Sequence, residues 1–265
     1  MSFLNLTNIA KSFGPRSILH DINLSLAEGE FVSIVGASAS GKTTLVKIAS
    51  GLIKADSGTV DAAGQPVAGF IQRAGMVFQN YSLLPWLSAL ENVRLAVEPA
   101  FPSWTKSQHT AQAMKYLEMV GLGKAARKTP AQLSGGMRQR VAIARAFAAE
   151  PRILFLDEPF GALDALTRAT LQQELATMCG AVGRPVTALM ITNSVEEAIL
   201  LSDRIHALGR GPGATLSPGF TVALPRPRSA GLLMHDAEAI SLRHRLAEFL
   251  TSGAIATPAL IKEVA

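Results

Sequence analysis

The chain has 265 residues, of which 48% are apolar and 17% are charged, a length that suits one large domain or one domain with an inserted subdomain. Its single cysteine, Cys179, excludes an intramolecular disulfide and an all-cysteine metal site. The net charge is +5, but the basic residues are scattered, which favours an ordinary solvated surface over a nucleic-acid patch.

Hydropathy gives the first expectation about location. No run approaches the about 20 apolar residues of a membrane-spanning helix, and the first residues lack the charged start and apolar stretch of a signal peptide. We therefore expect a cytoplasmic protein that reaches a membrane only by docking onto another chain.

The N-terminal part reads as strands. Residues 3–8 and 22–26 alternate apolar and polar positions, as half-buried strands do, and glycine-containing turns separate them. Residues 31–35 are a short apolar run that ends in glycine, which predicts a buried strand feeding a loop.

That loop matches the phosphate-binding pattern G-x-x-x-x-G-K-[ST]. Its glycines let backbone N–H groups face a phosphate, and the helix expected from Thr44 to Ile53 adds a positive dipole end. Lys42 is expected to reach the β- and γ-phosphates of ATP, and Thr43 to offer its hydroxyl to Mg²⁺. The residues expected to bind the nucleotide in this loop are Gly36, Ala37, Ser38, Ala39, Ser40, Gly41, Lys42, Thr43 and Thr44.

The middle of the chain changes from strands to helices. Residues 58–80 read as short strands with turns at Gly58 and Gly64, whereas apolar residues recur at helical spacing from 83 to 150. Apolar runs at 153–156 and 186–192 return as buried strands. We therefore predict a helical subdomain over approximately 83–150, inserted into an α/β domain that spans residues 1–225.

The C-terminal part has its own pattern. Residues 205–224 read as glycine-punctuated strands, and residues 236–250 carry the spacing of an amphipathic helix. We assign residues 226–265 to a C-terminal helical tail.

Two carboxylates follow the apolar run at 153–156. The carboxyl ends of strands form the edge at which open α/β sheets bind ligands, and adjacent strand residues point opposite ways. We expect Asp157 to join the metal shell and Glu158 to polarise the attacking water.

The segment Leu133–Gly136, in one-letter code LSGG, precedes a helix rich in small residues. Ser134, Gly135 and Gly136 form a second helix-start anion site. One protomer then carries two phosphate-binding helix starts, and an ATP held between two chains would use one from each.

In this order, GASASGKTT, LSGGMRQR and ILFLDEP resemble the ATP-binding subunit of ABC transporters over almost the whole length. The resemblance implies a P-loop NTPase core of the ABC ATPase type, an antiparallel β subdomain and an inserted helical subdomain. It implies that Phe13 stacks on adenine and that Gln79 senses Mg²⁺ and the membrane subunit. It also implies that the loop Gly161-Ala162-Leu163-Asp164 joins the two sites of a dimer, so Asp164 and Gln79 are expected among the catalytic residues. By contrast, Phe13, Trp86 and Phe249 could each be simple core residues.

The run NYSLLPW at 80–86 and the tail resemble the importer subgroup for nitrate, sulfonate, taurine and related small anions. This implies a homodimer or a heterodimer with a related ATPase subunit, an integral membrane permease and, indirectly, an external solute-binding protein. The resemblance implies no nucleic-acid partner, and it places the chain peripherally on the cytoplasmic face of the bacterial inner membrane.

The chain departs from the family pattern at two positions. Ala39 stands where the family usually has glycine, and in a left-handed conformation alanine costs about 1–2 kcal/mol. Asn193 stands where the family's switch segment has the histidine that holds the γ-phosphate. An asparagine keeps an N–H donor but cannot become positively charged, and losing one charge-stabilising contact commonly lowers the rate by about 10²–10³.

Three functions remain open from the sequence. The first is an ATPase that powers import of a small anion, and the second is a hydrolysis-impaired, nucleotide-gated regulatory subunit of such a transporter because of Asn193. The third is a soluble ABC-type ATPase acting on nucleic acid or ribosomes, which only the basic charge favours. The chain lacks the long insertions that such proteins usually carry.

Overall fold

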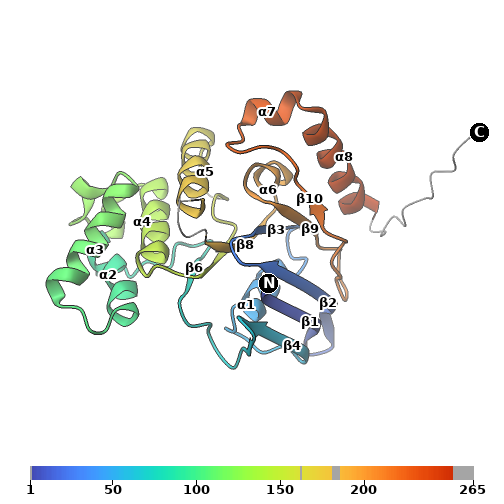
Figure 1. Ribbon diagram of the computed structural model, residues 1–265, viewed down its shortest axis with the longest axis horizontal. Helices are drawn as coiled ribbons and strands as arrows, with labels where there is room; N and C mark the ends of the chain where they lie inside the picture. The colour runs from blue at the N-terminus through green and yellow to red at the C-terminus, as the bar shows by residue number, and fades with distance from the viewer. Residues whose placement is uncertain (1, 162, 181–185, 253–265) are drawn as a thin grey trace, which may run out of the picture.

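The computed structural model describes residues 2–161, 163–180 and 186–252. Ala162, in the predicted dimer-joining loop, and the end of the predicted tail lie outside the described residues. The described part contains two β-sheets and a set of helices gathered at one end (Figure 1).

A four-stranded sheet has the order β2-β1-β4-β5, and its strands pair antiparallel, as the predicted β subdomain requires. These strands are β1 (Ser2–Phe13), β2 (Arg16–Ala27), β4 (Ser57–Ala62) and β5 (Gln65–Pro66). The first two are longer than the alternating segments that predicted them, because pairing continues past irregular positions in the register.

A six-stranded sheet has the order β10-β9-β3-β8-β7-β6. Its strands are β3 (Phe31–Val35), β6 (Ala74–Val77), β7 (Ile153–Asp157), β8 (Thr187–Thr192), β9 (Arg204–Ala207) and β10 (Phe220–Thr221). All pairs except β9 with β10 are parallel, so β3, β7 and β8 end at one edge. The phosphate loop after β3, the acidic residues at β7 and the switch segment after β8 therefore converge there.

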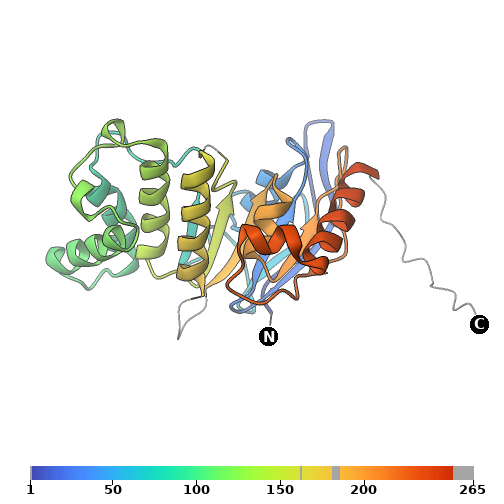
Figure 2. The same cartoon turned by 90° about the horizontal axis from the view of Figure 1, so that it is seen from above.

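The helices are α1 (Lys42–Ala49), α2 (Ala89–Ala100), α3 (Lys106–Met119), α4 (Gly135–Ala148), α5 (Ala165–Cys179), α6 (Val195–Leu201), α7 (Ala230–His235) and α8 (Ala237–Ser252). Helices α2, α3 and α4 gather at one end, and α4 stands beside α5 at the edge of the core in both views (Figures 1 and 2). Helices α7 and α8 lie at the other end, next to α6 and β9.

The helix after the phosphate loop is shorter than predicted. We expected it to run from Thr44 to Ile53, but α1 ends at Ala49 and Leu52 is 43% exposed. Gly51 has a φ of 79°, and a left-handed residue ends a right-handed helix. Helices α5 and α6 were not predicted. Helix α7 lies within the predicted helical tail, and α8 matches the predicted helix at 236–250 closely.

The exposed fractions of Phe13, Trp86 and Phe249 show which of these aromatic residues belong to the core. Phe249 is 8% exposed and belongs to the cluster that joins α8 to β9 and α6, so it is a core residue. Phe13 is 55% exposed and Trp86 is 71% exposed, so neither is a core residue of the chain.

Candidate nucleotide site

The phosphate loop is built on two left-handed residues. Ala39 has a φ of 61° and Gly41 a φ of 105°. A Cβ on Gly41 would lie 2.8 Å from Ile18 Cγ2, so only glycine fits there. Ala39 does adopt the conformation that alanine disfavours, at a cost of about 1–2 kcal/mol.

Lys42 lies inside this loop and is 4% exposed. Its Nζ donates hydrogen bonds to the carbonyl oxygens of Gly36 at 3.0 Å and Ala37 at 2.9 Å, and to Asn193 Oδ1 at 2.8 Å. Burial lowers the pKa of Lys42, and the nearby Glu158 carboxylate opposes that shift. The ammonium group and the N-terminus of α1 together fit a phosphate anion.

Ser40 adds a polar atom to this loop that fits the same anion. Its side chain is 5% exposed, and its buried Oγ has no hydrogen-bond partner among the described residues. A buried hydroxyl without a partner costs free energy, and a bound phosphate oxygen would satisfy it.

Thr43 and Asp157 form the expected metal position. Thr43 Oγ1 donates a 3.2 Å hydrogen bond to Asp157 Oδ1, at the last residue of β7. Asp157 is 5% exposed, and burial raises the pKa of its carboxyl group. Hydroxyl and carboxylate oxygens are the ligands that Mg²⁺ prefers, together with phosphate oxygens of a substrate.

Glu158 lies in a turn after β7 and not on the strand, which corrects the strand alternation that we expected. Strand β7 ends at Asp157, and Glu158 has a φ of 46°. Its backbone N–H donates to the carbonyl oxygen of Ile191 at 3.0 Å, which anchors this turn to β8. The two carboxylates therefore have different partners: Asp157 accepts from Thr43, whereas Glu158 accepts from Asn193 and Gln79.

The Glu158 carboxylate accepts hydrogen bonds from two of the predicted catalytic residues. Asn193 Nδ2 donates to its Oε1 at 2.8 Å, and Gln79 Nε2 donates to its Oε2 at 3.4 Å. Lys42 Nζ lies 3.7 Å from the same Oε1. The structure thus brings together residues that follow β3, β6, β7 and β8 along the chain.

A second group of predicted residues lines another cleft. Ser134 caps α4, with its Oγ accepting from Met137 N at 3.2 Å, and Asp164 caps α5, with its Oδ1 accepting from Thr167 N at 3.0 Å. Both line a cavity of about 370 Å³ with Gly135 and Gly136. A Cβ on Gly136 would lie 2.5 Å from Thr167 Cγ2, so glycine permits the close approach of α4 and α5.

Phe13 is at the end of β1, and Lys11 Nζ lies 5.4 Å from its ring centroid. Because Phe13 is 55% exposed, a stacking partner could reach it. Adenine stacking remains a prediction.

Sequence reasoning missed the buried network behind the switch segment. Glu197 is 7% exposed, and its Oε2 accepts from Thr192 Oγ1 at 2.6 Å. Gln172 Nε2 donates to Glu197 Oε1 at 3.4 Å, and Arg168 Nε lies 3.8 Å from the same oxygen. Burial raises the pKa of Glu197. Through Glu197, the network connects α5 to Thr192, the residue before Asn193. The only sign of it in the sequence is the acidic pair Glu196-Glu197.

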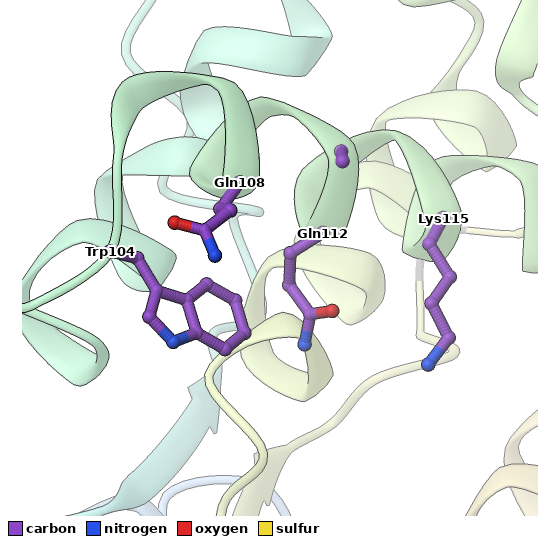
Figure 3. A pocket seen from close by; sticks show the side chains of 5 residues that line it. Trp104, Gln108, Gln112 and Lys115 are labelled. Atoms are coloured by element: carbon purple, nitrogen blue, oxygen red, sulfur yellow. The ribbon is translucent and has the colours of Figure 1, made fainter.

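A hollow on α3 contains none of the predicted site residues. Figure 3 shows Trp104, Gln108, Gln112 and Lys115 along it, and its volume is about 280 Å³. The indole of Trp104 stacks on Phe101, with ring centroids 4.0 Å apart.

Comparison with known proteins identifies the family. Residues 19–161 match the family model described as ABC transporter. The chain belongs to the ABC transporter family. A dimeric bacterial ABC transporter cassette has the same fold, with a TM-score of 0.73 and 32% identity, covering 84% of this chain and all of that one. A dimeric ATP-binding cassette bound to ADP and Pi matches with a TM-score of 0.72 and 32% identity over the same shares. The predicted fold class is thereby confirmed.

Curated relatives are named as ATP-binding proteins for nitrate import and bicarbonate transport. The nitrate import ATP-binding protein NrtD of Synechococcus elongatus is 44% identical over 94% of this chain and 91% of its own length. The bicarbonate transport ATP-binding protein CmpD of Synechocystis is 41% identical, over 94% and 89%. The bicarbonate transport ATP-binding protein CmpC of Synechococcus elongatus is 45% identical over 94% of this chain, which spans only 38% of that relative's length.

In the part of the chain that the structure describes, no helix is both long and apolar enough to span a bilayer.

Proposed function

We propose that this chain is the ATP-binding and ATP-hydrolysing subunit that powers import of a small anion through a membrane permease. The observation that carries the proposal is the pair of half-sites on one chain. Lys42 and Asp157 belong to the first, and the signature residues Ser134–Gly136 and Asp164 to the second. Such a chain completes a nucleotide site only with the second half-site of another copy or of a related ATPase subunit.

The chain's own residues supply the groups that hydrolysis needs. Lys42 and the phosphate-loop N–H groups would hold the phosphates, and Thr43, Asp157 and Gln79 would hold Mg²⁺, which neutralises phosphate charge when bound. Glu158 would accept a hydrogen bond from the attacking water and orient it. Phe13 would stack on the adenine ring, and Asp164 would face the partner's site.

An exposed segment on the chain supports docking to a permease. Trp86 is 71% exposed, yet the buried amide of Asn92 fixes the residues before and after it. Leu84 N donates to Asn92 Oδ1 at 2.8 Å, and Asn92 Nδ2 donates to the carbonyl oxygens of Leu84 and Leu87, each at 3.1 Å. A large apolar side chain on a fixed support is typical of a binding surface.

Two experiments test this function. The purified chain should release phosphate from Mg-ATP, and Lys42→Ala should abolish that release. Affinity isolation from native cytoplasmic membranes should recover a permease, with less recovered for Trp86→Ala at unchanged ATP binding. Loss of the chain should then lower uptake of nitrate, bicarbonate or a sulfonate such as taurine, and an unchanged uptake of all of them would contradict the importer function.

Asn193 favours a second candidate, a hydrolysis-impaired and nucleotide-gated regulatory subunit. Its amide contacts Glu158 and Lys42 but carries no positive charge for the γ-phosphate. This candidate predicts that Asn193→His raises the ATP turnover of a homodimer by an order of magnitude or more, since one such contact is commonly worth about 10²–10³ in rate. Equal turnover of the two proteins would remove it.

A further inference from the structure

Two consecutive residues after Gln79 have strained backbones. Tyr81 has a φ of 64° and Ser82 a φ of 48°, and neither is glycine. Left-handed conformations of such residues cost about 1–3 kcal/mol each and persist only where the surroundings fix them. Something must therefore hold the chain in this turn.

Arg145 of α4 holds it. Its Nη2 donates to the carbonyl oxygen of Tyr81 at 2.9 Å, and its Nη1 donates to the carbonyl oxygen of Ser82 at 2.7 Å. A planar guanidinium can make two such bonds in a fixed geometry, which a lysine cannot reproduce. The turn is thus fastened to the helix that starts at the signature residues.

The side chain of Tyr81 lies near residues at the N-terminal end of the same helix. Arg138 lies two helical turns before Arg145 on α4, and its Cζ lies 5.5 Å from the Tyr81 ring centroid. A Cβ on Gly135 would lie 3.4 Å from the Tyr81 hydroxyl oxygen. The Tyr81 side chain therefore lies against the first turn of α4, with its ring beside Arg138 and its hydroxyl beside Gly135, where Ser134, Gly135 and Gly136 line the second half-site.

We infer that Tyr81 is a positioning residue that couples the two half-sites of one chain, with its main chain fixed by Arg145 and its ring against the signature turn. Two residues earlier, Gln79 donates to Glu158 in the first half-site. A shift of the segment that begins at Gln79 would therefore move the signature turn as well. This inference rests on the proposed function, in which the signature turn closes on the ATP of the other chain.

The test separates nucleotide binding in the first half-site from ATP-driven pairing of two chains. Tyr81→Ala should leave the Kd for a fluorescent ATP analogue within about twofold, because the first half-site is intact. ATP-dependent dimerisation, followed by light scattering, should weaken, and turnover should fall about tenfold or more, since a misplacement of about 1 Å can cost that much. Tyr81→Phe keeps the ring and should retain most of both.

The matched control is Tyr116→Ala, which removes the only other tyrosine. Tyr116 lies on α3 and, like Tyr81, is partly buried against the hydrophobic core that includes α4. Equal pairing and equal turnover in the two alanine variants would overturn the inference while leaving the proposed function intact. If the unaltered chain neither binds nor hydrolyses ATP, both the inference and the proposed function fail. Should Tyr81→Ala not fold, Arg145→Lys must show the same loss of pairing at unchanged Kd, and normal pairing in that variant overturns the inference.

Discussion

Asn193 donates a 2.8 Å hydrogen bond to Glu158 through Nδ2 while its Oδ1 accepts from Lys42 Nζ at 2.8 Å. A neutral amide thus stands between the phosphate-loop cation and the proposed water-orienting carboxylate. An amide carries both a donor and an acceptor, so it satisfies both neighbours at once. The switch position is therefore integrated into the site even though it lacks the family's histidine.

Replacing this amide by a carboxylate should weaken nucleotide binding. In Asn193→Asp, the new charge would lie beside Glu158 and would pair with Lys42, which the phosphates need. We expect the Kd for ATP to rise at least about tenfold, which corresponds to about 1.4 kcal/mol. Titration with a fluorescent ATP analogue measures it, and Asn23→Asp on β2 is the control. An unchanged Kd would show that Lys42 is not engaged by residue 193.

The phosphate loop should gain stability from a glycine. Ala39 has a φ of 61°, so Ala39→Gly removes an unfavourable left-handed alanine and should stabilise the fold by about 1 kcal/mol. The neighbouring Ala37→Gly only adds freedom to the unfolded chain, because Ala37 is not among the residues with positive φ, and should destabilise. Denaturant midpoints compare the two, and a lower midpoint for Ala39→Gly would contradict the conformational argument.

The parts of the site that the sequence predicts are those whose chemistry is local. The glycines and Lys42 of the phosphate loop must sit at fixed spacing along one turn, so a spacing pattern finds them. The acidic pair at the end of β7 follows from the same logic. The turn at Glu158 could not be predicted, because it depends on a hydrogen bond to Ile191 on another strand.

The missed helices have a comparable cause. The apolar residues of α5 do not gather on one face of the helix. One side of α5 contacts α4, and another side carries Gln172, which donates to Glu197 of α6. Helix α1 was extended too far because Leu52 fits the helical spacing, whereas Gly51 takes the left-handed conformation. Periodicity reports which face is apolar; tertiary contacts decide where an element begins and ends.

A buried arginine should stabilise the packing of α6 against the segment that follows β10. Arg228 is 8% exposed, and it donates to the carbonyl oxygens of Ile199, Leu224 and Val222 at 2.8, 3.1 and 3.2 Å. Burial lowers its pKa to about 10. Arg228→Met would leave these carbonyls without donors and should cost about 2 kcal/mol in the free energy of unfolding.

The control for that substitution is Arg226→Met two residues earlier. The side chain of Arg226 is 38% exposed; it pairs with Asp203 at 2.8 Å and donates to one carbonyl oxygen, that of Leu201, at 2.7 Å. Because it is more exposed and holds one carbonyl where Arg228 holds several, its loss should cost about 1 kcal/mol. Chemical denaturation of both variants measures the two costs. Equal destabilisation would mean that the carbonyl contacts of Arg228 contribute little.

The single thiol should make stability depend on pH in the alkaline range. Burial raises the pKa of Cys179 from 9.0 to about 12. Between these values the unfolded chain releases the thiol proton and the folded chain keeps it, so the folded state binds more protons and stability falls as pH rises. From pH 8 to pH 10 this group alone should remove roughly 1 kcal/mol. Cys179→Ala lacks this contribution and keeps every other titrating group, so its denaturation midpoint should fall less over the same interval. Parallel pH dependences for the two proteins would mean that the thiol ionises equally in both states.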